Sequence, residues 1–164
     1  CHLIIIGDVM RFLVLATLSG LALMGCASVQ QAPNTQETIR YASSPCFGAC
    51  PIYSVEVTPT GLIRFEGKQY TKAIGVKEIQ GSVKDYQKLA DELKTYRPQT
   101  GTQSKTAGCQ QTATDMPSYY ITWIQPNGTE TKLSHYTGCI SPANNRLNKV
   151  MEKLPEQLGI KDLI

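Results

Sequence analysis

Two stretches of similar sequence predict the fold: residues 51–57 read PIYSVEV and residues 117–123 read PSYYITW. In each stretch, a proline is followed two residues later by tyrosine and two residues further on by an aliphatic residue. Tyr53, Val55 and Val57 alternate with polar residues, which is the period of a half-buried β-strand. A turn with proline and glycine follows each stretch, at residues 59–61 and 126–128. The sequence therefore predicts two hairpins built on the same plan.

A helix is predicted after the first hairpin. Ser82 and Asp85 have the spacing of a capping box, in which each side chain binds a free backbone N–H group at the helix start. Apolar residues follow at helical spacing from residue 83 to residue 96, and Pro98 ends the pattern. Further strands are expected at residues 38–41, at Ile63 and Phe65, and at residues 70–80 and 129–136.

A second helix is predicted after the second hairpin. Ser141 is a suitable cap and Pro142 suits the first helical position. Apolar residues between 147 and 154 share one helical face, Pro155 is expected to break the helix, and residues 158–164 are expected to pack as a final turn. The order strands, helix, strands, helix indicates an α+β fold, with an antiparallel sheet built from two hairpin-plus-helix halves and the helices on one face.

The segment between the two halves, residues 97–116, is long and polar. A structureless loop of this length is uncommon unless it is functional or attached to the rest of the domain. Because Cys109 lies within it, we expect a disulfide to attach it.

The N-terminal region predicts export. Met10 is the expected start, which would make residues 1–9 an upstream extension, and Arg11 precedes an apolar run of signal-peptide length at residues 12–24. The sequence Leu23-Met24-Gly25-Cys26 resembles the lipobox of bacterial lipoprotein precursors. This resemblance implies cleavage after residue 25 and acylation of Cys26, palmitate being a typical acyl group, with anchoring through the lipid chains.

The expected organisation is therefore a signal peptide at residues 10–25, a lipidated flexible tether at 26–37 and one globular domain at 38–164. Ala27, rather than aspartate, favours the outer membrane by resemblance to enterobacterial sorting rules, with the domain in the periplasm. The net charge of +3 comes without a cluster of lysine or arginine, so no nucleic-acid partner is expected. The expected partners are the membrane and either peptidoglycan or another envelope protein.

Four of the six cysteines lie in the expected domain: Cys46, Cys50, Cys109 and Cys139. An even number in an oxidising compartment indicates disulfide bonds, and four cysteines allow three pairings. The residues alone leave these pairings open.

The first two cysteines belong to a specific motif. Pro45-Cys46-Phe47-Gly48-Ala49-Cys50-Pro51-Ile52-Tyr53, together with Asp115 and Pro117 at the second strand block, resembles an uncharacterised bacterial family, domain of unknown function 6438. Over residues 38–154, this resemblance implies an envelope location and the fold type, but no activity. Because many members carry only the first two cysteines, it also implies the pairs Cys46–Cys50 and Cys109–Cys139.

An alternative interpretation is a copper- or thiol-handling protein. The spacing of Cys46, Cys50 and Pro51 also resembles the metal loop of certain envelope copper chaperones, and His135 could supply a third ligand. In those chaperones, however, the motif leads into a helix, whereas here it leads into a predicted strand. We therefore expect no metal and no cofactor. Because no nucleophile elbow or comparable catalytic motif is present, we expect a binding or structural module rather than an enzyme.

Overall fold

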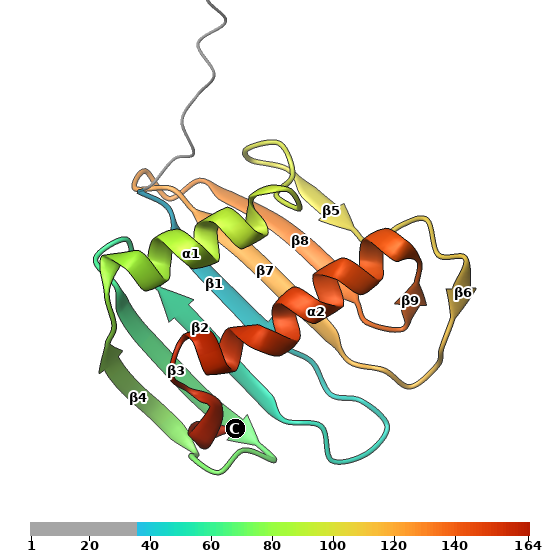
Figure 1. Ribbon diagram of the computed structural model, residues 1–164, viewed down its shortest axis with the longest axis horizontal. Helices are drawn as coiled ribbons and strands as arrows, with labels where there is room; N and C mark the ends of the chain where they lie inside the picture. Colours follow the sequence, from blue (N-terminus) through green and yellow to red (C-terminus); the bar gives the residue numbers. More distant parts are fainter. Residues whose placement is uncertain (1–35) are drawn as a thin grey trace, which may run out of the picture. The chain divides into compact units, whose positions relative to one another are not determined.

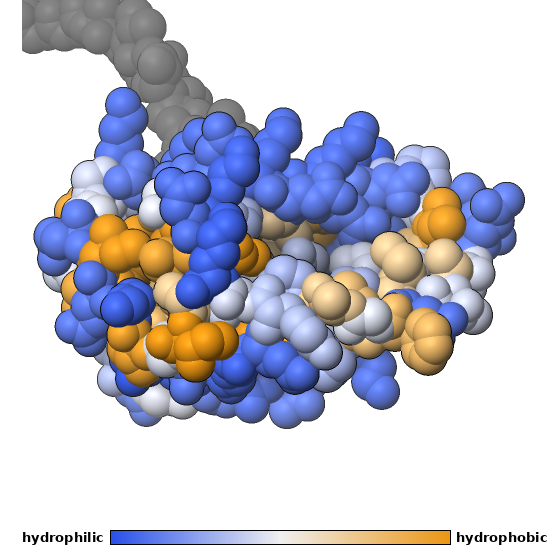
Figure 2. Space-filling view, turned by 90° about the horizontal axis from the view of Figure 1, so that it is seen from below, coloured by the Kyte–Doolittle hydropathy of each residue, from blue (hydrophilic) through white to orange (hydrophobic). Residues whose placement is uncertain are grey.

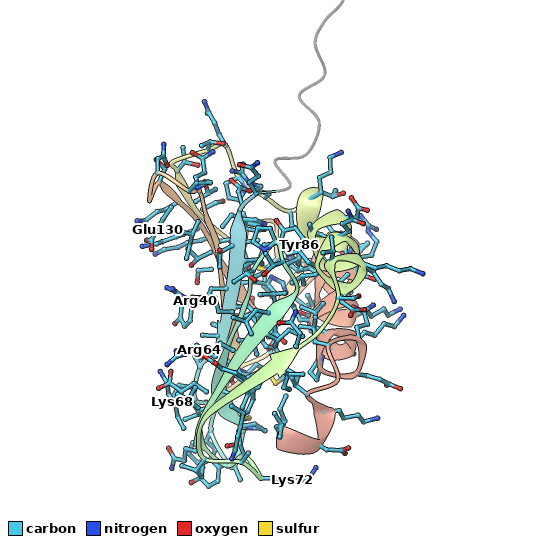
Figure 3. The ribbon with its side chains drawn as sticks, turned by 90° about the vertical axis from the view of Figure 1, so that its left-hand side faces the viewer. Arg40, Arg64, Lys68, Lys72, Tyr86 and Glu130 are labelled. Carbon is cyan, nitrogen blue, oxygen red and sulfur yellow. A yellow bond between two sulfur atoms is a disulfide. The ribbon has the colours of Figure 1, made fainter. Side chains whose placement is uncertain are left out.

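The computed structural model describes residues 36–164, so the predicted signal peptide and Cys26 lie outside the described residues. The domain is α+β, as predicted, with one large, mostly antiparallel sheet and two helices. Figures 1 and 3 show both helices on the same face of this sheet. No helix among residues 36–164 is long and apolar enough to cross a membrane.

The large sheet has seven strands in the order β4-β3-β2-β1-β7-β8-β5 (Figure 1). The strands are β1 (Thr38–Ser43), β2 (Ile52–Val57), β3 (Leu62–Gln69), β4 (Gly75–Gln80), β5 (Gln103–Lys105), β7 (Ser118–Ile124) and β8 (Glu130–Tyr136). A separate two-stranded sheet pairs β6 (Gln111–Thr112) with β9 (Cys139–Ile140). The strand that begins the domain, β1, therefore lies in the middle of the large sheet and joins the two hairpin groups.

The alternating sequence of the strands produces two distinct sheet faces. Inward-pointing residues such as Tyr41, Val55 and Phe65 are fully buried beneath the helices. The opposite face is polar: Arg40, Arg64 and Glu130 project away from the helices in Figure 3, and Arg40 forms an ion pair with Glu56 at 2.6 Å. Burial of the apolar face against the helices drives this layering.

Helix α1 (Val83–Lys94) begins with the predicted capping box, because Ser82 Oγ accepts from Asp85 N while Asp85 Oδ2 accepts from Ser82 N. The first hairpin turn packs against this cap. Gly61 has φ +86°, and a Cβ atom there would lie 2.5 Å from the Ser82 carbonyl carbon. Only glycine fits both the backbone conformation and this close approach.

Helix α2 (Pro142–Gln157) begins at the predicted cap, Ser141, but the expectation that Pro155 breaks it is wrong. Proline removes one backbone donor and can kink a helix, but only two residues of α2 follow Pro155, so little of the helix lies beyond the disturbance. A single-turn helix, η1 (Lys161–Leu163), follows, and Leu158 and Ile160 are buried in the core as predicted.

The polar segment between the halves contains more structure than the sequence pattern indicates. Strand β5 pairs in parallel with β8, and β6 pairs with β9. All three residues of β5 are exposed, so no apolar alternation reveals the strand. The backbone instead binds the free edge of β8, with Lys132 N donating to Thr102 O at 2.9 Å.

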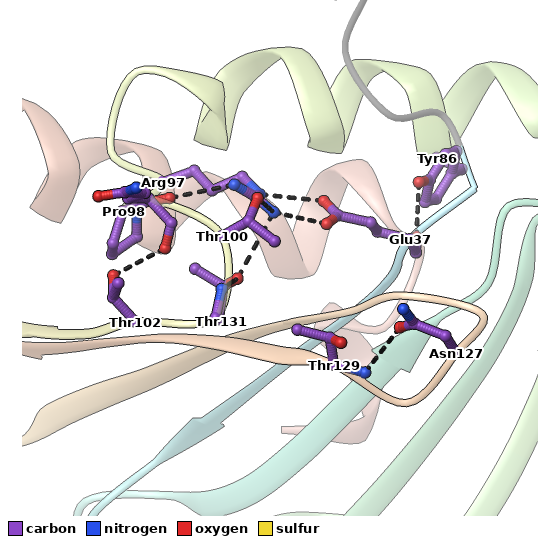
Figure 4. A network of polar contacts seen from close by, with 11 residues as sticks. Glu37, Tyr86, Arg97, Pro98, Thr100, Thr102, Asn127, Thr129 and Thr131 are labelled. Carbon is purple, nitrogen blue, oxygen red and sulfur yellow. Dashed lines mark hydrogen bonds and ion pairs between the residues drawn. The ribbon is translucent and has the colours of Figure 1, made fainter.

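An ion pair attaches the start of the domain to the end of α1 (Figure 4). Arg97 donates to both Glu37 carboxylate oxygens, at 2.6 and 3.0 Å, and Glu37 is 4% exposed. Tyr86 of α1 donates to Glu37 O at 2.6 Å. The buried carboxylate and the backbone carbonyl of Glu37 therefore both have hydrogen-bond partners, as buried polar groups require.

Candidate functional site

A row of polar side chains crosses the inner face of the sheet at its other end. Ser43 of β1 pairs with Tyr119 of β7, and Tyr119 pairs with His135 of β8. On the other side, Ser43 Oγ accepts from Tyr53 N at 3.1 Å. The row Tyr53, Ser43, Tyr119 and His135 therefore spans four adjacent strands beneath α2. We call it the polar row.

A cleft of about 300 Å³ lies between part of this row and the C-terminal half of α2. The sheet, α2 and the segment that follows α2 all contribute to its lining, which consists of Ser43, Pro51, Tyr53, Tyr119, Glu152, Pro155, Glu156, Lys161 and Ile164. We call this space the α2 cleft. Its volume is at the lower end of the range for small-molecule sites, so it suits a small ligand.

The tyrosine hydroxyls at the α2 cleft lie beside each other. Tyr53 is 4% exposed, and its hydroxyl and that of Tyr119 influence each other's pKa through a hydrogen bond. Tyr41, two residues before Ser43 on β1, is fully buried, and its hydroxyl has no partner among residues 36–164. Buried hydroxyls without partners are uncommon, because each loses its bonds to water. Tyr53 and Tyr119 both line the cleft, and a phenol oxygen can take part in more than one hydrogen bond, so these hydroxyls can also bond to a molecule in the cleft.

The tyrosines remain protonated at neutral pH. Burial raises the pKa of Tyr53, and the neighbouring Tyr119 raises it further. Burial also raises the pKa of Tyr119; the hydrogen bond with Tyr53 lowers it, and the carboxylate of Glu152 raises it. Both hydroxyls can therefore donate and accept hydrogen bonds. Glu152 and Tyr119 line the same cleft.

The disulfide loop of the sequence motif forms the edge of this site. Cys46 and Cys50 are joined, with their Cα atoms 5.8 Å apart, and Ser43 Oγ donates to Pro51 O at 2.7 Å. Phe47 N donates to Asp115 O at 3.2 Å, so the two parts of the motif are in contact. Within the motif, Pro51 and Tyr53 line the cleft. Gly48 supplies a backbone conformation with φ 137° at the loop tip.

Phe47 is the most exposed large apolar residue of the described chain, at 88%, and Met116 beside it is 45% exposed. Figure 2 views the end of the domain where this loop and the β3–β4 hairpin lie, and apolar side chains gather in two areas of that end. An exposed apolar patch beside the disulfide loop is typical of an interaction surface.

The second disulfide joins Cys109 to Cys139, so disulfide bonding is confirmed and both pairs are those that the family resemblance implied. The Cα atoms of Cys109 and Cys139 are 4.9 Å apart, and Cys139 is buried. This bond attaches the polar segment before β7 to the start of α2.

Nothing in the structure favours the copper- or thiol-handling alternative. Cys46 and Cys50 are bonded to each other, and His135 is 1% exposed with both ring nitrogens engaged. Thr106 Oγ1 lies 2.9 Å from Nδ1 and Asn148 Oδ1 lies 2.6 Å from Nε2. Among residues 36–164, no group of three or more histidine, cysteine, aspartate or glutamate side chains is placed to hold a metal ion.

The partners of the two ring nitrogens indicate the protonation state of His135. Asn148 donates through its amide nitrogen to Thr137 O, so its oxygen is free to accept from His135 Nε2. Nδ1 lies 2.9 Å from the Thr106 hydroxyl, which also bonds to Ser134 O. Burial lowers the pKa of His135, although the bond to Asn148 opposes this shift. The neutral imidazole therefore joins β8, α2 and the segment after β5.

Comparison with known families agrees with the sequence motif. A family described as a domain of unknown function, DUF6438, matches residues 37–157. The chain belongs to this family. The matched residues include both disulfides, the polar row and most of the α2 cleft of this DUF6438 protein, so the features described above lie in the part that defines the family. No curated protein and no solved structure matches the chain.

The sequence motif identified Pro51 and Tyr53 but not the rest of the site. Tyr119 is, in the sequence, only a tyrosine of the second predicted hairpin, and Glu152 and Glu156 are polar positions of an amphipathic helix, with nothing in the sequence to distinguish them. Their spacing of four residues places both on one helical face, which is the only local signal that could have linked them.

Proposed function

We propose that this DUF6438 protein is a lipid-anchored module of the bacterial cell envelope that binds a small ligand in the α2 cleft without catalysing a reaction on it. The observation that carries the proposal is a cleft of about 300 Å³ whose lining combines the hydroxyl-bearing residues Ser43, Tyr53 and Tyr119 with the carboxylates of Glu152 and Glu156. A few polar groups that converge in a small cleft are typical of a ligand site.

The two disulfides and the core support a binding role, because they hold the cleft walls in place before a ligand arrives. Pro51 and Ser43 are linked to the Cys46–Cys50 loop, and α2 packs on the sheet through Leu147, Met151 and Leu154. Preorganised walls reduce the entropy cost of binding. The exposed Phe47 next to the cleft offers a further contact for a partner in the envelope.

The envelope location rests on the sequence. Leu23-Met24-Gly25-Cys26 supports acylation of Cys26, and the residue that follows supports transfer to the outer membrane. The residues between Cys26 and Glu37 would then tether the binding domain in the periplasm, where disulfides form.

The proposal is tested by blocking the cleft. Glu152→Trp places a large side chain at an exposed position that lines the cleft, and Lys149→Trp makes the same change at an exposed position of α2 outside the cleft lining. The assay is ligand-observed NMR of the full chain in detergent micelles with a diverse fragment library. We expect fragments to bind the wild type and Lys149→Trp but not Glu152→Trp. If no fragment binds, or if Glu152→Trp binds them equally well, the cleft is not a ligand site.

A further inference from the structure

The charges around the α2 cleft indicate which chemical class it recognises. Glu152 lies on the wall and forms no ion pair with any group among residues 36–164. Glu156 lies one turn further along α2, and Lys161 is 3.5 Å from its carboxylate. The cleft thus presents two carboxylates and one ammonium group, and that ammonium is already paired. A cationic ligand would be attracted and an anionic one repelled.

The tyrosine hydroxyls share the cleft with the unpaired charge. Tyr53, Tyr119 and Glu152 all line it, and the Glu152 carboxylate raises the pKa of the Tyr119 phenol. A protonated primary amine has three N–H donors and no acceptor. The Glu152 carboxylate and the oxygens of Tyr119 and Tyr53 together provide three acceptors for such a group.

The remaining wall is apolar. Pro51, directly before β2, and Pro155 of α2 line the cleft, as does Ile164 in the segment that follows α2. These residues suit the methylene stem of an alkylamine, much as lysine buries its stem while its charged end remains polar.

We propose that the α2 cleft binds a small primary alkylamine, with the ammonium group between Glu152 and the hydroxyls of Tyr119 and Tyr53. This inference rests on the proposed function, because it names the ligand class of the same site. The volume of about 300 Å³ limits the bound part to a short chain.

Three probes of equal length and different charge test the proposal: 1,5-diaminopentane, 1,5-pentanediol and glutarate. Each is titrated into the full chain in detergent micelles by isothermal titration calorimetry. We expect saturable binding of the diamine only, weakened by added salt because the interaction is between charges.

Two glutamine variants test whether diamine binding requires the Glu152 carboxylate. Glu152→Gln removes the carboxylate at the cleft, whereas Glu78→Gln removes the same charge from exposed strand β4. We expect Glu152→Gln to weaken diamine binding by about tenfold or more and Glu78→Gln to leave it unchanged. Glu152 is exposed and forms no side-chain hydrogen bond with another group among residues 36–164, so thermal unfolding of the variant should match that of the wild type.

The outcomes separate this inference from the proposed function. If the diol or glutarate binds as tightly as the diamine, or if Glu152→Gln binds the diamine normally, the ligand class is wrong. If none of the three probes binds while fragments still compete for the cleft, the amine inference fails and the binding module stands. If fragments also fail to bind, both proposals are overturned.

Discussion

One hydroxyl group joins the disulfide loop to the sheet. Ser43 Oγ donates to Pro51 O and accepts from Tyr53 N, and Ser43 is 8% exposed. Removing this hydroxyl would leave two backbone groups without partners where water has little access. The position of Pro51 and Tyr53 at the α2 cleft therefore depends on a serine that no catalytic or binding motif contains.

His135 makes stability depend on pH. Its pKa in the folded protein is lowered by burial, so between that value and the ordinary pKa of about 6.5 the unfolded chain binds more protons than the folded one. The stabilisation is full above about pH 6.5 and is lost as the pH falls through this window. We expect His135→Gln to reduce this loss, measured by urea unfolding at about pH 7.5 and about pH 5.5. An equal loss in both proteins would show that His135 is not responsible.

At the scale of secondary structure, local pattern predicts the elements that have an apolar face. The alternation in β2 and β7 and the capping box of α1 were all visible in the sequence and are present in the structure. Strands β5 and β6 were missed because all their residues are exposed. Their backbones are held by pairing with β8 and β9, which the local sequence does not reveal.

The two disulfides should contribute unequally to stability. The chain-entropy relation gives about 3.5 kcal/mol for Cys109–Cys139, at a sequence separation of 30, and about 2 kcal/mol for Cys46–Cys50, at a separation of 4. We expect the paired replacement Cys109→Ala with Cys139→Ala to lower the free energy of unfolding more than Cys46→Ala with Cys50→Ala. Urea titration of both variants measures this, and the reverse order would contradict the entropic account.

At the scale of the whole molecule, the described domain is a two-layer unit whose polar row and α2 cleft lie at one end of the sheet, while the Glu37–Arg97 pair closes the core at the other. The pair adjoins β1, the strand that continues from the expected tether. A ligand in the cleft would therefore bind at the end of the sheet opposite to the start of β1 (Figure 1).

Attachment to the membrane is expected to depend on one cysteine. We expect metabolic labelling with an alkynyl palmitate analogue to mark the wild-type protein, and Cys26→Ala to lose the label because no thiol remains at the acylation position. The variant Cys46→Ala with Cys50→Ala serves as the control, because it removes two cysteines and retains Cys26. Label that persists in Cys26→Ala would mean that the lipobox interpretation is wrong.

The sequence by itself determined the class of fold, the starts of both helices, the principal strands and the family motif. These features are local. The two-residue alternation of a strand is visible within seven residues, and the two members of a capping box are three residues apart. A turn glycine such as Gly61 is likewise visible, although its contact with Ser82 is not.

Only the tertiary structure decided the position of β1, the polar row and the α2 cleft. Tyr53 and Tyr119 come from separate hairpins and meet because β1 lies between them in a particular register. Glu37 and Arg97 are 60 residues apart and pair only when α1 lies on the sheet. Such contacts follow from strand order and from packing of helices on the sheet, which depend on burial across the entire core rather than on any local pattern.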